Sequence, residues 1–224
     1  MTEITEHLRE IRERVSRAAH ASGSDVMIVA VSKQQSVAAI QSVHAAGLTH
    51  FGENYLQEAL PKIAALADTA LEWHFIGAVQ ANKTRQIAEL FQWVHTVDRE
   101  KIAAKLNAAR PYYAAPLNDL IQVNLAREPQ KAGVAESEVA PLAAAIRELP
   151  RLAFRGLMCM PPAAAGADER RALFTRTSEL AQELRSLGHP ADVLSMGMSD
   201  DFELAIACGA TCVRLGAAIF GPRG

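Results

Sequence analysis

The sequence predicts an α/β protein that folds as a single (β/α)8 TIM barrel with an N-terminal helix. Short β-rich runs alternate with longer helical patterns along the chain, which is typical of a parallel sheet. Several of these runs are apolar at successive positions, as expected of strands covered on both faces. The 224 residues approach the usual length of such a barrel, about 250 residues. One domain is therefore expected over residues 1–224.

We expect eight strands, each a short run of apolar and β-branched residues that ends in glycine or polar residues. In chain order they are "VMIVAVSK" (26–33), "LTHFGE" (48–53), "LEWHFIG" (71–77), "QWVHTV" (92–97), "DLIQVNL" (119–125), "AFRGLMCM" (153–160), "ADVLSMG" (191–197) and "TCVRLG" (211–216). The segment "NAARPYYAAPLN" (107–118) is interpreted as a loop. An open, doubly wound sheet is the competing interpretation. Nothing resembling a Gly-x-Gly-x-x-Gly turn follows the first strand, so a dinucleotide-binding fold is less well supported.

Helices are expected between the strands. The N-terminal segment places apolar residues on one stripe with a 3.6-residue period, namely Ile4, Leu8, Ile11 and Val15. The segment 168–187 repeats this pattern. Glycine followed by a brief turn and a strand indicates a left-handed residue that ends a helix. Four glycines have this setting: Gly23, Gly47, Gly188 and Gly209.

Composition narrows the function classes. The net charge is −2 and the charges are spread out, so no basic surface for nucleic acid or an anionic membrane is expected. The longest apolar runs are too short to span a bilayer, and the charged N-terminal segment does not resemble a signal peptide. The cysteines form no disulfide framework and no CxxC pair; they are Cys159, Cys208 and Cys212. We expect a cytoplasmic protein.

Unusual residues collect where the expected strands end, and in (β/α)8 barrels that is where the active site lies. Lys33 ends the first strand, and Arg214 lies at the end of the last. Such barrels commonly bind phosphate on the loops after strands seven and eight. Small residues that let backbone N–H groups approach an anion occur in both loops: Ser195, Gly197, Ser199 and Gly216.

A lysine, an arginine and a phosphate cradle at one barrel mouth suggest pyridoxal phosphate. A neutral lysine amine can form a Schiff base with the aldehyde of the cofactor. Each residue also has a structural interpretation. Lys33 could be a solvated residue of the barrel rim, and Arg214 could form a salt bridge with Glu53 or Asp201. His74 is better explained as a core histidine, and Asn54 could cap the following helix.

Several motifs resemble the pyridoxal phosphate homeostasis proteins over nearly the whole chain, from about residue 26 to Gly221. They are "VAVSK", "HFGENYLQEA", "WHFIGAVQANKTR", "VHTVDR", "QVNLAREPQKAGV", "RGLMCMPP" and "LSMGMSDDFELAIACGATCVRLGAAIFG". The resemblance implies a barrel similar to the N-terminal domain of alanine racemase, with pyridoxal 5′-phosphate held as an internal aldimine. It assigns the aldimine to Lys33, a cofactor contact to Asn54, and a possible second acceptor of cofactor to Lys131.

The same resemblance identifies the residues around the rest of the cofactor. It implies that Ser195 binds the phosphate, that Met196 lines the site, that Arg214 contacts the pyridine nitrogen and that Gly216 contacts the phosphate. The sequence departs from the family pattern at Ala217, where a threonine or serine hydroxyl is common. The backbone N–H of Ala217 can still donate, but one hydrogen bond to a charged group is lost, and such a bond contributes about 1.5–3 kcal/mol.

The resemblance implies a binding protein without established catalysis. Racemisation needs an acid–base group on each face of the substrate, and the lysine supplies only one. The tyrosines are poorly placed to supply the other; they are Tyr55, Tyr112 and Tyr113. We therefore expect a monomer that buffers pyridoxal phosphate and delivers it to apo enzymes that use it, which keeps vitamin B6 and amino-acid pools in balance. A small racemase or lyase is the alternative, and a phosphosugar-binding barrel is a third hypothesis.

Overall fold

The structure is a computed structural model that describes residues 3–23, 25–126 and 132–221. Eight parallel strands close into a barrel in the order β1 to β8, and β8 pairs with β1. The closed barrel confirms the predicted fold class and excludes the open sheet. The strands are β1 (Met27–Val31), β2 (His50–Glu53), β3 (Glu72–Phe75), β4 (Trp93–Val97), β5 (Leu117–Val123), β6 (Leu152–Cys159), β7 (Val193–Ser195) and β8 (Cys212–Leu215).

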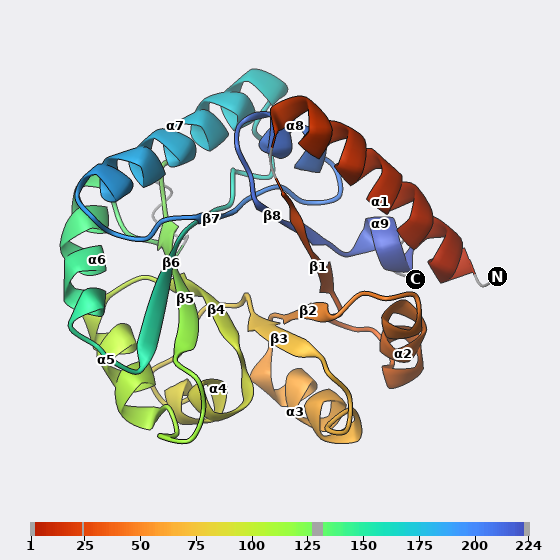
Figure 1. Cartoon of the computed structure of the whole chain (residues 1–224), viewed down its shortest axis with the longest axis horizontal. Coiled ribbons are helices and arrows are strands. Elements are labelled where there is room, and N and C mark those ends of the chain that lie inside the picture. The colour runs from red at the N-terminus through yellow and green to blue at the C-terminus, as the bar shows by residue number, and fades with distance from the viewer. Residues whose placement is uncertain (1–2, 24, 127–131, 222–224) are drawn as a thin grey trace.

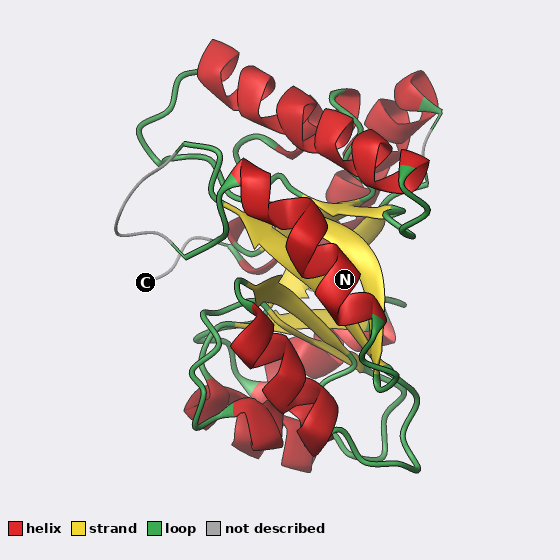
Figure 2. Ribbon diagram, turned by 90° about the vertical axis from the view of Figure 1, so that its left-hand side faces the viewer, coloured by secondary structure: helices red, strands yellow, loops and turns green. Residues whose placement is uncertain are grey.

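Helices surround the barrel (Figure 1) and enclose its strands when the molecule is seen from the side (Figure 2). They are α1 (Glu3–Ser22), α2 (Val37–Ala45), α3 (Leu56–Ala65), α4 (Thr84–Leu90), α5 (Glu100–Ala109), the 3-10 helix η1 (Glu136–Glu138), α6 (Val139–Arg147), α7 (Ala167–Ser186), α8 (Phe202–Ala207) and α9 (Ala217–Phe220). None of the helices in the described ranges is both long enough and apolar enough to cross a bilayer.

The N-terminal helix α1 lies outside the barrel next to α8 and α9 (Figure 1). The predicted stripe forms its inner face, because Leu8, Ile11 and Val15 are buried and Ile4 packs against the same core. The expected helix ends are also confirmed, since each of the four glycines has a positive φ. The values are 69° at Gly23, 86° at Gly47, 82° at Gly188 and 100° at Gly209.

The predicted loop at 107–118 is too long at both ends. Helix α5 continues to Ala109, and β5 begins at Leu117. The connection between α5 and β5 is held by Arg110, which contacts the end of α4. Its Nη1 donates to the carbonyl oxygens of Ala88 (2.6 Å) and Phe91 (2.8 Å), which end α4, and its Nε donates to that of Ala115 (2.8 Å). The sequence pattern does not show this long-range contact.

Side chains alternate along each strand between the barrel interior and the helices. Outward residues form the main apolar core under the helices. Inside the barrel, a smaller apolar cluster contains Trp93, Leu120 and Met158, with Met27 and Val193 packed against it. Polar residues occupy the remaining interior positions, and these determine the geometry of the candidate site.

Candidate functional site

A cavity of about 290 Å³ opens at the carboxyl ends of the strands. Five residues that the sequence analysis assigned to a cofactor site line it: Lys33, Asn54, Arg214, Gly216 and Ala217. The structure therefore brings the lysine, the arginine and the glycine turn to one place. Methionines add apolar surface to the wall; they are Met158, Met160 and Met198.

The other two predicted site residues, Ser195 and Met196, do not line this cavity. Both are fully buried, Met196 in the apolar core and Ser195 in the barrel interior. Ser195 ends β7 in register with Met158, and its hydroxyl is occupied by protein partners, Arg214 and His95. Ser199, four residues later, lines the cavity instead, and its Oγ accepts the N–H of Ala218 at 3.2 Å. The hydroxyl that the loop after β7 offers is thus that of Ser199.

The loop that carries Ser199 depends on Gly197. This residue has φ 92°, and a Cβ there would lie 2.6 Å from Cβ of Ala205 and 2.9 Å from Cα of Phe202. Both the left-handed conformation and the close approach of α8 require glycine. This turn leads into residues 198–200, which line the cavity.

Arg214 reaches the cavity from inside the barrel and is almost fully buried. Its Nη1 donates to the carbonyl oxygen and to Oγ of Ser195, both at 2.7 Å, and its Nη2 donates to the carbonyl oxygen of Cys159 at 3.2 Å. Its expected carboxylate partners bind other cations: Glu53 binds Lys62 and Asp201 binds Arg170. Burial lowers the pKa of Arg214, yet arginine keeps its proton in proteins. Arg214 is thus a desolvated cation held by neutral oxygens.

A chain of hydrogen bonds extends from Arg214 through the barrel to its other end. Ser195 Oγ contacts Nδ1 of His95 at 2.8 Å, and Nε2 of His95 contacts Nδ1 of His74 at 2.9 Å. Nε2 of His74 then contacts Nδ1 of His50 at 3.1 Å. We refer to His50, His74, His95 and Ser195 as the histidine chain. The expectation that His74 is a buried core histidine is confirmed, but its partners are other histidines.

The histidine chain is neutral in its buried part. Burial, reinforced by the positive charge of Arg214, lowers the pKa of His95 to about 3. Burial also lowers the pKa of His74 well below its ordinary value, and the neighbouring His95 and His50 act in the same direction. Each neutral ring therefore donates one hydrogen bond and accepts another.

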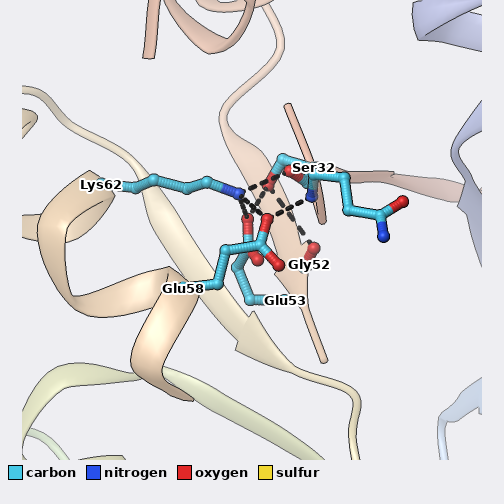
Figure 3. A network of polar contacts seen from close by, with 6 residues as sticks. Ser32, Gly52, Glu53, Glu58 and Lys62 are labelled. Atoms are coloured by element: carbon cyan, nitrogen blue, oxygen red, sulfur yellow. Dashed lines mark hydrogen bonds and ion pairs between the residues drawn. The ribbon is translucent and has the colours of Figure 1, made fainter. Parts of the chain in front are cut away.

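A second buried network lies behind Lys33, between β1, β2 and α3 (Figure 3). We call it the lysine 62 network. Nζ of Lys62 donates to the carbonyl oxygen of Ser32 (2.7 Å), to Oε1 of Glu53 (2.9 Å) and to Oε1 of Glu58 (2.6 Å). Oγ of Ser32 also donates to Oε1 of Glu53 at 2.6 Å. The residue just before Lys33 is therefore fixed through both its main chain and its side chain.

Glu58 extends this network to the other side of Lys33, because it accepts the backbone N–H of Gln34. Gln34 has φ 62°, a left-handed conformation that is uncommon for a residue other than glycine. Burial alone would raise the pKa of Glu58, but hydrogen bonds from Lys62 and Gln34, with the charges of Lys62 and Lys33, lower it. Backbone strain of this kind gathers at functional sites, and here it lies next to Lys33, which lines the cavity.

Asn54 contributes a polar atom that lacks a partner within the described residues. Its Oδ1 is buried at the cavity wall without a hydrogen bond. It does not cap α3, because Tyr55 occupies the cap position. Gly77 packs against its backbone so closely that a Cβ would lie 2.0 Å from the carbonyl oxygen of Asn54. A buried acceptor of this kind fits a ligand that donates a hydrogen bond.

Sequence reasoning did not identify the lysine 62 network or the histidine chain. Glu58 and Lys62 have the i, i+4 spacing of an ordinary exposed helix pair, and nothing local indicates that Lys62 is buried. The other lysine assigned a role, Lys131, lies outside the described residues.

Comparisons with known proteins identify the family of this chain. Residues 7–224 match the family model "Alanine racemase, N-terminal domain". The chain is 51% identical over 226 residues to a pyridoxal phosphate homeostasis protein of Pseudomonas aeruginosa, covering 100% of this chain and 97% of that protein. The protein of the same name from Escherichia coli K12 is 44% identical over 236 residues, covering 100% and 98%.

Solved structures of other proteins have a similar fold. PipY of Synechococcus elongatus, with pyridoxal phosphate (PLP) bound, is 36% identical with a TM-score of 0.88, covering 98% of this chain and 100% of that one. Alanine racemase of Corynebacterium glutamicum shares the fold at 16% identity, with a TM-score of 0.71 over 98% of this chain and 61% of its own.

Proposed function

This chain belongs to the pyridoxal phosphate homeostasis protein family, and we propose that it binds pyridoxal 5′-phosphate in the cavity at the carboxyl ends of its strands. The observation that carries the proposal is that Lys33 and Arg214 line one cavity. The relatives bear the family name, and the PipY structure contains PLP. Both facts support the same ligand for this chain.

In this proposal the residues of the cavity have separate roles. Lys33 would hold the cofactor covalently, because a neutral lysine amine can condense with an aldehyde and release water. Arg214 faces the pyridine nitrogen, and Asn54 accepts a hydrogen bond through Oδ1. The phosphate lies against the small residues of the last two loops, Ser199, Gly216 and Ala217. Ser199 replaces Ser195 in this role, because its side chain is the one at the wall.

We further propose that the protein stores and delivers the cofactor, and that it is not an enzyme. The tyrosines are exposed, with 61% of Tyr55, 89% of Tyr112 and 81% of Tyr113 accessible, and none lines the cavity. Within the described cavity wall, Asp200 is the other ordinary acid–base group besides Lys33, and it lies at the exposed rim. An arginine at the pyridine nitrogen also makes the ring a weaker electron sink than a carboxylate would.

The cytoplasm as the place of action, a monomeric state and apo enzymes as recipients belong to the same proposal. No disulfide joins the described cysteines, which supports a reducing compartment; they are Cys159, Cys208 and Cys212. Transfer to an apo enzyme is measured as activity that appears after the loaded protein is mixed with it, at a rate above that of release into buffer.

The binding proposal is tested by titrating the purified protein with pyridoxal phosphate and recording its visible absorption. We expect one cofactor per chain, and borohydride reduction followed by peptide mapping should place the label on Lys33. Lys33→Ala should lose the band, whereas Lys101→Ala, a change at an exposed lysine of α5, should keep it. No band in the native protein would reject the proposal and favour the phosphosugar hypothesis.

The same loaded protein separates a carrier from a racemase or lyase. Amino acids are incubated with it in deuterium oxide, and the α-proton is followed by nuclear magnetic resonance. A carrier leaves the α-proton in place across a panel of amino acids. Exchange that depends on Lys33 would instead show that the site performs amino-acid chemistry.

A further inference from the structure

A cluster of side-chain atoms that could bind a metal lies at the opposite end of the barrel from the cavity. His50 begins β2 and Glu72 begins β3, and His74 follows two residues later on β3. Nδ1 of His50 is 3.1 Å from Nε2 of His74 and 3.6 Å from Oε2 of Glu72. All three ligand atoms lie within 4.8 Å of one another.

The spacing of these atoms suits a small divalent cation. Zinc binds imidazole nitrogen and carboxylate oxygen at about 2.0–2.2 Å with tetrahedral geometry, so two ligand atoms are separated by roughly 3.3–3.5 Å. The two distances at His50 fall on either side of that range. Small side-chain rotations would bring all three atoms to bonding distance. Two nitrogens and one oxygen are donors that zinc and similar transition metals prefer over calcium or magnesium.

The ligands are held by a layer of outer contacts, as metal ligands usually are. Nδ1 of His74 contacts Nε2 of His95 at 2.9 Å, and Nε1 of Trp93 donates to Oε2 of Glu72 at 2.9 Å. The rings of His74 and Trp93 are stacked, with 5.3 Å between centroids and 8° between planes. These contacts fix the orientation of the buried His74 imidazole and of the Glu72 carboxylate without occupying Nε2 of His74.

One arrangement of protons satisfies the whole histidine chain and leaves a lone pair for a cation. If Nδ1–H of His95 donates to Ser195, then Nε2 of His95 accepts from Nδ1–H of His74. Nε2 of His74 then presents a lone pair toward His50. Without a cation, that lone pair is satisfied by a single proton on Nδ1 of His50. A cation would replace that proton, and both imidazoles would bind it through nitrogen lone pairs.

Solvent can reach the cluster from one side. The side chains of His50 and Glu72 are 24% and 46% exposed, whereas His74 is fully buried. A cation could therefore enter from the solvent, and one coordination position would remain for water. We propose that His50, Glu72 and His74 form a binding site for a divalent cation of the zinc class. This cation site is separate from the proposed cofactor cavity, because it lies at the other end of the barrel.

Zinc titration of tag-free, metal-free protein by calorimetry tests this site. The experiment uses no pyridoxal phosphate, so its result is independent of the cofactor proposal. We expect one zinc ion per chain. His50→Ala and Glu72→Gln should each weaken binding at least tenfold, whereas His20→Ala, at an exposed histidine of α1, should leave it unchanged. His50 and Glu72 are chosen because they are partly exposed, so both variants should fold; circular dichroism checks this.

Cobalt identifies the donor atoms. The cobalt-loaded protein should show the visible d–d absorption of a tetrahedral site without a sulfur charge-transfer band, and His50→Ala should lose that absorption. The proposal is overturned if native protein binds no zinc, if His50→Ala binds zinc as well as the native protein does, or if sulfur bands show that cysteines hold the metal.

Discussion

The lysine 62 network and the network around Arg214 are both buried, but their cations have different kinds of partner. The lysine 62 network contains one cation and two carboxylates, and Lys62 contacts both carboxylates directly. In the network around Arg214, the one cation donates to a hydroxyl and two carbonyl oxygens, and neutral imidazoles follow beyond that hydroxyl. In the first network the buried cation has carboxylate partners within the protein. The second leaves a buried cation that an acceptor on a ligand would complete.

Because of this difference, we expect one network to stabilise the fold and the other to bind a ligand. Removing one partner of a buried ion pair leaves an uncompensated charge, which is strongly destabilising. Removing a buried cation that has no anionic partner relieves a desolvation cost instead. The lysine 62 network should therefore support the fold and the strained turn at Gln34, whereas Arg214 should support binding.

The largest effect is expected from Lys62→Met. The variant leaves Glu53 fully buried without its ion-pair partner, so the free energy of unfolding should fall by about 3–5 kcal/mol. Urea denaturation at neutral pH measures it. Adding Glu53→Gln should recover part of the loss. Arg85→Ala, which breaks an exposed pair with Glu89 on α4, should cost under about 0.5 kcal/mol. A loss that small for Lys62→Met would show that the network does not stabilise the fold.

Arg214→Met should show the opposite pattern. We expect a free energy of unfolding within about 1 kcal/mol of the native value, because relief of the desolvated cation offsets the hydrogen bonds lost at the carbonyl oxygens of Ser195 and Cys159. Affinity for pyridoxal phosphate should fall roughly ten- to hundredfold, the equivalent of about 1.5–3 kcal/mol for a hydrogen bond to a charged group. Denaturation and cofactor titration measure the two quantities. Arg147→Met, at an exposed residue of α6, is the control. Severe destabilisation with unchanged affinity would reverse the assigned roles.

The sequence predicts the residues at the barrel mouth better than it predicts the histidine chain. Lys33 and Arg214 end apolar strands, so local pattern places both at the barrel mouth. The histidine chain is different, because it crosses strands diagonally. His50 is paired with Glu72, so His74 lies one inward step further along the axis. Such a path depends on the stagger between strands, which the order of residues does not reveal.

Asp119 differs from both networks, because it is a buried carboxyl group with neither a cation nor a neutral hydrogen-bonding group as partner among the described residues. Both of its oxygens lack a hydrogen-bond partner among the described residues. Burial raises its pKa from 3.8 to about 8. The folded state thus keeps a proton that the unfolded state releases above its lower pKa. The contribution of this group to stability is fully present below about pH 4 and is lost as pH rises toward 8.

Asp119→Val tests that contribution. The substitution should raise the free energy of unfolding at neutral pH by about 1–3 kcal/mol, the cost of an unsatisfied buried polar group. It should also flatten the decline in stability that the native protein shows between pH 5 and 8, which a series of urea denaturations measures. Asp192→Asn, at an exposed residue before β7, should change neither quantity. Equal pH dependence in native protein and Asp119→Val would mean that Asp119 is not the titrating group.

The smallest effect concerns the proposed phosphate end of the cavity, where Ala217 offers no hydroxyl. Ala217 is exposed at the first position of α9, beside Ser199 and Gly216, so a threonine side chain has room there. Ala217→Thr should tighten pyridoxal phosphate binding about tenfold, near the lower limit of about 1.5 kcal/mol for one hydrogen bond to a charged group. Ala104→Thr on α5 controls for the substitution itself. If affinity stays unchanged, Ser199 already supplies the hydroxyl that the phosphate needs, and the loop after β7 compensates for the loop after β8.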